Sequence, residues 1–148
     1  MKKIVILLLA VSLVLPAMSA VADDTIGELR KVAGMAFVER NRVRIVAKDG
    51  FSVMQNDVIK TGKDASLGIV FRDNTRLSIG PETELILSRY IFEPAQNRFE
   101  FLVRIIKGTA AYISGSIGKL APQSVGIETP TATIGIRGTS FCAKVKDS

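Results

Sequence analysis

Residues 66–79 read SLGIVFRDNTRLSI, and this stretch decides the fold. Its large apolar residues occupy every second position on either side of a polar interruption: Leu67, Ile69, Phe71, Leu77 and Ile79. A period of two is typical of a β-strand that buries one face. Asn74 lies in the interruption, and asparagine tolerates a positive φ better than most residues. The stretch therefore predicts a β-hairpin with a tight turn at Asp73-Asn74.

The same alternation recurs along the chain, and turn residues separate the runs at intervals of about 8–12 residues. It predicts further strands at 26–32, 35–39, 42–46, 57–60, 84–88, 99–105, 109–114, 125–127, 131–136 and 139–145. Lys107-Gly108 is expected to end one strand, and residues 115–123 read as a loop or one helical turn. The predicted fold class is all-β: a single compact domain of about 10–12 short, mostly antiparallel strands, in a roll, a sandwich or a short solenoid-like arrangement.

The N-terminus has the features of an export signal. Two lysines precede an apolar run at 4–15, and small residues follow as far as Ala22. A membrane span needs about 20 apolar residues, so a cleaved signal peptide at 1–22 is favoured over an uncleaved anchor. Cleavage before Asp23 would leave residues 23–148 as one exported domain, in the periplasm or outside the cell, with no membrane span.

Composition argues against several kinds of site. The chain has no His and one Cys, so it lacks the commonest general base, the commonest metal ligand and an internal disulfide. We expect no enzyme activity, no cofactor and no metal. Cys142 is expected to pack as a small apolar residue in a strand, with an intermolecular disulfide as the alternative. The net charge is +6, but the cations are scattered apart from a mild cluster at Arg40, Arg42 and Arg44, which argues against a nucleic-acid partner.

Several segments, taken in order, resemble the FecR domain family: 56–62, 65–71, 71–79, 107–110 and 129–141. The last reads TPTATIGIRGTSF and is the most specific of them. Order and spacing agree with the family over about residues 29–146. Asn56 and Asn74 stand where the family usually has Gly, and both are compatible with the same turns. The motif residues, expected to be mainly structural, are Asp57, Thr61, Gly62, Asp73, Thr75, Gly108, Thr129, Pro130, Gly135, Arg137, Gly138, Thr139 and Phe141.

The chemistry of some motif residues can be read without the family. Asp57 and Asp73 lie at turns, where a carboxylate can accept backbone N–H groups. Gly135 and Gly138 leave space for a close backbone approach or a bulge. Arg137 is expected to form a buried fork with a carboxylate, Asp57 or Asp73. The alternative for Arg137 is a role in binding a ligand or a partner.

The resemblance implies a regulatory role in the bacterial envelope. The best-known members of the family span the membrane and relay an iron-siderophore signal, which needs a cytoplasmic segment; only residues 1–3 precede the apolar run here. We therefore expect a non-enzymatic, exported protein-interaction module that docks to an envelope protein through an exposed strand edge. The alternative is a module that binds a carbohydrate or the cell wall, although stacking residues are scarce. The oligomeric state stays open, and a self-assembling scaffold is a third, minor hypothesis.

Overall fold

The computed structural model describes residues 23–147. The expected signal peptide, with its cleavage site after Ala22, falls on residues outside that range, whereas Asp23 lies just inside it and is exposed. Within the described range, no helix is both long and apolar enough to cross a membrane.

Strands make up most of residues 23–147: β1 (Thr25–Ala33), β2 (Ala36–Arg40), β3 (Val43–Val46), β4 (Ser52–Met54), β5 (Val58–Thr61), β6 (Ser66–Phe71), β7 (Arg76–Ile79), β8 (Glu84–Glu93), β9 (Arg98–Ile113), β10 (Val125–Glu128), β11 (Thr133–Gly135) and β12 (Ser140–Val145). Three short helical segments join them: η1 (Pro94–Gln96), α1 (Ser116–Leu120) and η2 (Pro122–Ser124). The all-β prediction is confirmed, and of the two alternatives left open for 115–123, a loop or one helical turn, the helical turn is present as α1. The strand β4 was not predicted, because three residues are too few to show a period.

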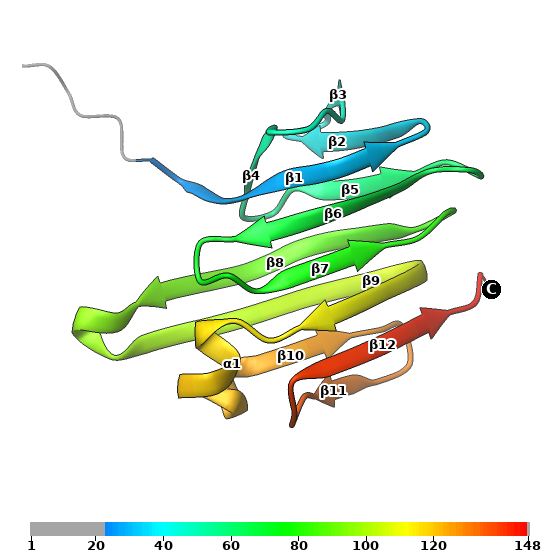
Figure 1. The fold of residues 1–148 in the computed structure, drawn as a ribbon. Helices are drawn as coiled ribbons and strands as arrows, with labels where there is room; N and C mark the ends of the chain where they lie inside the picture. The colour runs from blue at the N-terminus through cyan, green and yellow to red at the C-terminus, as the bar shows by residue number, and fades with distance from the viewer. Residues whose placement is uncertain (1–22, 148) are drawn as a thin grey trace, which may run out of the picture.

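The strands form one curled sheet (Figure 1) in the order β3-β2-β5-β8-β9-β7-β6-β1-β4. The strands β10 and β12 pair with β9, and β11 pairs with β10. The hairpin predicted at 66–79 is present as β6 and β7, which pair antiparallel from Leu67↔Ile79 to Val70↔Arg76. Asn74 has a φ of 64° in its turn, as expected. The strands β10 and β9 pair in parallel, whereas the other strand pairs are antiparallel.

The long strand β9 joins the two halves of the sheet. Its first part pairs with β8 between Arg98 and Lys107, and its last part pairs with β7 and β12. Gly108 lies at the junction and has a φ of 98°. The prediction that the strand ends at Lys107-Gly108 was therefore wrong: the positive φ of glycine bends the strand, and pairing continues on the other side.

The curl brings the inner faces of the two halves together. Phe71 on β6 stacks on Tyr90 of β8, with ring centroids 5.5 Å apart, and meets Phe101 of β9 edge-on at 5.0 Å. Tyr112, farther along β9, lies 5.5 Å from Phe101. Aromatic pairs in these geometries add stability beyond the area they bury. The core therefore lies between the halves, and the outer faces and strand edges are left for solvent or partners.

Candidate protein-docking surface

Asp57, in the first family-like motif, is fully buried and serves the fold. Its carboxylate accepts two hydrogen bonds from the Arg40 guanidinium, at 2.8 Å from Nε and 2.7 Å from Nη2. It also accepts the Met54 N–H at 2.8 Å, as expected for a turn aspartate. Hydrogen bonding to Asp57 raises the pKa of Arg40 above its ordinary value. The buried fork predicted for Arg137 is thus made by Arg40, and Arg137 is exposed.

This correction has a physical reason in the pattern of β2. Ala36 and Val38 are buried on the inward face of the strand, and Arg40 has the same parity. A cation on an inward face needs a buried acid to offset the loss of hydration. The signal for Arg40 was therefore present in the sequence, whereas Arg137 lies between Ile136 and Gly138 in a connection between strands.

Asp73 is a second buried hub. Its Oδ2 accepts hydrogen bonds from Thr75 Oγ1 at 2.6 Å and from the Ile117 N–H at 3.0 Å. Its Oδ1 accepts the Tyr90 hydroxyl at 3.1 Å and the Thr75 N–H at 3.2 Å. The Asp73 N–H in turn donates to the Tyr90 oxygen at 2.9 Å. Burial, together with the nearby Asp73 carboxylate, raises the pKa of Tyr90 well above its ordinary value. The hub ties the β6–β7 turn to α1 and to β8.

Threonine hydroxyls form a third hydrogen-bonded cluster, after those at Asp57 and Asp73, where β5, β8 and β9 meet. Thr61 Oγ1 donates to the Gly80 carbonyl at 2.7 Å and accepts the Thr83 N–H at 2.9 Å. Thr83 Oγ1 accepts the Thr109 N–H at 3.0 Å. A Cβ added at Gly108 would lie 2.2 Å from that same Oγ1, so only glycine fits there. The buried and hydrogen-bonded motif residues are therefore Asp57, Thr61, Asp73 and Thr75, and the half-buried Gly62 and Gly108 lie beside them.

The terminal motif lies mostly at the surface. Its exposed members are Pro130, Gly135, Arg137, Gly138 and Thr139, and its half-buried members are Thr129 and Phe141. Thr129 closes the β10–β11 turn, since its hydroxyl donates to the Ala132 carbonyl and accepts the Ala132 N–H, both at 3.1 Å. Gly138 has a φ of 129°, which favours glycine. The close backbone approach expected at Gly135 and Gly138 is found at neither, because a Cβ at either position would meet open space.

An open strand edge and a groove lie beside this motif. The six-residue strand β12 pairs with β9, and its other edge has no strand partner within residues 23–147. A groove of about 530 Å³ runs between β12 and the β10–β11 connection. Ile134, Phe141 and Val145 line it and are half-buried. Lys144 and Lys146 also line it, and neither forms an ion pair with any described residue. We call β12 and this groove the β12 edge.

Cys142 lies in the middle of the β12 edge and is exposed. The expectation that it packs as a small apolar residue was wrong. Ala143 is buried and Phe141 and Val145 are half-buried, so the strand alternation turns Cys142 and Lys144 outward. Cys142 is therefore exposed at the surface, and it is one of the residues that line the groove.

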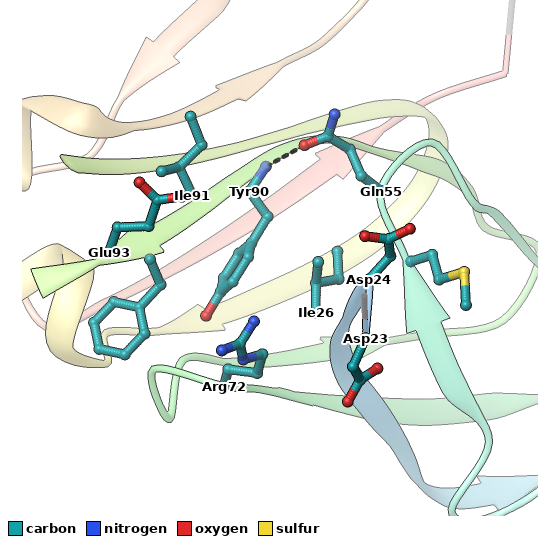
Figure 2. Close-up of a pocket in the computed structure, with 10 residues that line it drawn as sticks. Asp23, Asp24, Ile26, Gln55, Arg72, Tyr90, Ile91 and Glu93 are labelled. Atoms are coloured by element: carbon teal, nitrogen blue, oxygen red, sulfur yellow. Dashed lines mark hydrogen bonds between the residues drawn. The ribbon is translucent and has the colours of Figure 1, made fainter. Parts of the chain in front are cut away.

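A second hollow, of about 470 Å³, lies where the start of β1 meets the end of β8 (Figure 2). Asp23, Asp24 and Glu93 make its lining acidic, with Arg72 as the single cation in it. The carboxylates of Asp23 and Asp24 point in different directions in Figure 2 and do not converge on one point. Tyr90 also lines the hollow, but its hydroxyl is already bonded to the buried hub. This hollow therefore assembles no set of groups directed at one ligand.

The described residues hold no group of three or more Cys, Asp or Glu side chains placed to bind a metal ion. A family model described as "FecR protein" matches residues 57–148. No curated protein matches the chain, and no solved structure matches it. The match includes both buried carboxylate residues, the bend of β9 and the whole β12 edge.

Proposed function

The chain belongs to the FecR family, and from that premise we propose that it is an exported regulatory module that docks to a protein of the bacterial envelope. The family suggests a signalling role and is non-enzymatic. A module of this kind acts through what it binds, so the question becomes which surface receives the partner. The observation that carries the proposal is the β12 edge.

The β12 edge has the features of a site for strand addition. An unpaired edge offers a row of backbone N–H and C=O groups to an incoming extended segment. The groove beside it gives apolar side chains of that segment a place on Ile134, Phe141 and Val145. Main-chain hydrogen bonds would supply affinity, and the groove would supply specificity.

Charge supports an acidic, extended segment of an envelope protein as the proposed occupant. Lys144 and Lys146 line the groove without acidic partners, and Arg137 is exposed nearby on the connection to β12. Glutamate or aspartate side chains of a partner would meet these cations as its backbone pairs with β12. A second copy of this chain fits less well, because pairing two β12 strands would bring the same cations together.

Cys142 provides a way to test this, because it is the single cysteine of the chain and is exposed at the proposed site. A benzophenone attached to its thiol should crosslink one envelope protein, and mass spectrometry should place the crosslink in an acidic segment. In the matched control, Cys142→Ser is combined with Gln96→Cys, which moves the probe to an exposed position in η1. That control should not give the same crosslink.

Affinity measurement completes the experiment. The purified acidic segment should bind the Lys144→Glu/Lys146→Glu variant about tenfold more weakly than the unmodified chain, with a lower association rate. Lys31→Glu/Lys63→Glu makes the same charge change at exposed positions elsewhere and should leave the affinity unchanged. Equal affinities for the two variants, or retention on peptidoglycan with no protein partner, would refute docking at the β12 edge.

A cell-wall glycan is the second candidate, and one surface favours it. A shallow groove of about 870 Å³ crosses the outer face of β1, β6 and β7 and carries Arg30, Lys31 and Arg76. Its lining mixes the small residues Ser66, Gly68 and Ser78 with the apolar Val70 and Ile113, and it has no aromatic residue on which a sugar ring could stack. Peptidoglycan pull-down with Arg76→Glu, compared with the β12 variants, would separate this binding mode from protein docking.

A further inference from the structure

The β2–β3 hairpin lies at the opposite end of the sheet from β12 (Figure 1) and has an unusual turn. Arg40 pairs with Val43, so Asn41 and Arg42 alone form the connection. Their φ angles are 50° and 65°. Two positive φ values in a two-residue hairpin are typical of a type I′ turn, which favours Asn followed by Gly. Arginine at the second position is therefore strained.

Within the described residues, the Arg42 side chain has no polar contact that could offset this strain. Arg40 forks onto Asp57, and the Arg44 guanidinium lies over the Phe37 ring at 5.2 Å. Arg42 is exposed and, within residues 23–147, makes no side-chain hydrogen bond or ion pair. A strained residue with no internal contact to hold it suggests a function outside the fold.

The strand that follows the turn is open to a partner. β3 pairs with β2, and its other edge has no strand partner in the described part of the chain. Val43 and Val46 are 60% and 56% exposed, which is high for valine in a sheet. An exposed apolar edge of this kind invites pairing with another chain.

We propose that the β2–β3 hairpin is a second docking surface, where an acidic, extended segment of a protein partner pairs with β3 and Arg42 binds one of its carboxylates. Charge complementarity supports this occupant: Arg42 and Arg44 are exposed cations, and the nearby Glu39 is engaged by Lys60 at 3.1 Å. The proposal goes beyond docking at the β12 edge, because it uses the other end of the sheet. A chain with both sites would bridge two partner segments.

The strained turn allows a test that separates binding from stability. Arg42→Gly should relieve the strain, keep the fold and raise the midpoint of thermal unfolding by about 2–5 °C. Arg42→Asn should keep the turn as well, since asparagine tolerates this φ, and it also removes the charge. Lys31→Gly is the matched control: Lys31 is an exposed cation with a φ of 51°, away from the hairpin.

The probe is a fluorescent ten-residue peptide of alternating Glu and Val, titrated against the full exported domain at low salt. Binding should slow hydrogen exchange at the amides of residues 43–46. Arg42→Gly and Arg42→Asn should each weaken binding at least fivefold, and Lys31→Gly should not. The proposal would be overturned by unchanged binding to both Arg42 variants, or by a lack of exchange protection at residues 43–46. It would also be overturned if anionic phospholipid vesicles or polygalacturonate bind through Arg42 and the peptide does not.

The outcome is independent of the first site. Lys144→Glu/Lys146→Glu should leave peptide binding at the hairpin unchanged, because the substituted residues are on the far edge of the sheet. Loss of peptide binding in that variant alone would assign the peptide to the β12 edge, refuting the hairpin site while leaving the first proposal standing.

Discussion

The hub at Asp73 gives the sharpest test of whether the buried motif residues build the fold. Replacing Asp73 with Ala removes both carboxylate oxygens. Four donors then lose their acceptor inside the protein: the Tyr90 hydroxyl, the Thr75 hydroxyl, the Thr75 N–H and the Ile117 N–H. The side chains around the hub are buried, so water can replace the acceptor only if the structure opens.

The magnitude follows from these four contacts. Leaving one buried donor unsatisfied costs about 1–3 kcal/mol, and partial relaxation favours the lower end of that range. We expect Asp73→Ala to lower the free energy of unfolding by about 4–6 kcal/mol, in a domain whose total is of order 5–15 kcal/mol. Asp73→Asn keeps one acceptor oxygen and should lose about 2 kcal/mol. Tyr90→Phe leaves the Asp73 N–H unpaired and should lose about 1–3 kcal/mol.

Urea unfolding followed by far-UV circular dichroism measures these losses. Asp73→Asn is the informative variant, since Asp73→Ala is expected to be near the limit of folding. Asp64→Asn, at an exposed turn, is the control and should change stability by less than about 0.5 kcal/mol. The double variant Asp73→Asn/Tyr90→Phe should depart from additivity by about 1 kcal/mol, because the two side chains share hydrogen bonds. A loss below about 0.5 kcal/mol for Asp73→Asn, or strict additivity, would refute a structural hub.

Three further outcomes follow from the geometry. Arg40→Gln should lower the free energy of unfolding by about 2–3 kcal/mol in urea titration, because it leaves a buried carboxylate without its cation, whereas Arg137→Gln, at an exposed position, should change it by less than about 0.5 kcal/mol; equal effects would contradict the fork. Gly108→Ala should lose at least about 2 kcal/mol through its positive φ and a Cβ 2.2 Å from a threonine oxygen, while Gly135→Ala should be neutral by the same assay. Cys142 should react fully with iodoacetamide in the native state at the rate of a small thiol, and slow labelling would contradict its exposure.

Local patterns made much of the sheet predictable. The hairpin β6–β7 shows a period of two with a turn residue between its strands, and in both this hairpin and the β2–β3 hairpin neighbours in sequence pair directly. The left-handed turn residues Asn56 and Asn74 were also predictable, because few side chains accept a positive φ. These features depend on residues close together in the chain.

The partners of the buried carboxylates depend on contacts between distant residues. Asp57 and Arg40 are 17 positions apart, and β5 and β2 must pair before they meet. Arg137 was predicted to form the fork because it lies between glycines. The better signal was that Arg40 has the same parity as the inward-facing residues of β2. The same parity argument, applied to Phe141 and Val145, would have placed Cys142 on the outer face of β12.

The edge strands of the sheet differ in length and in how far their backbone groups are free to pair. Within residues 23–147 the sheet has four edge strands, β3, β4, β11 and β12. Two of them are blunted: β4 and β11 have three residues each, and the Ser52 carbonyl of β4 already accepts a hydrogen bond from Arg40 at 2.9 Å. Short or covered edges are a common defence against unwanted pairing.

The two longer edge strands, β3 and β12, are not covered, but both carry cations. Arg44 lies on β3 and Lys144 on β12, so copies of this chain would bring like charges together however these edges met. An acidic strand would meet the opposite charge at both edges. If this reasoning is right, raising the ionic strength should weaken binding of an acidic segment at either edge while increasing self-association at high protein concentration. Self-association that falls as salt is added would show that the cations do not protect these edges.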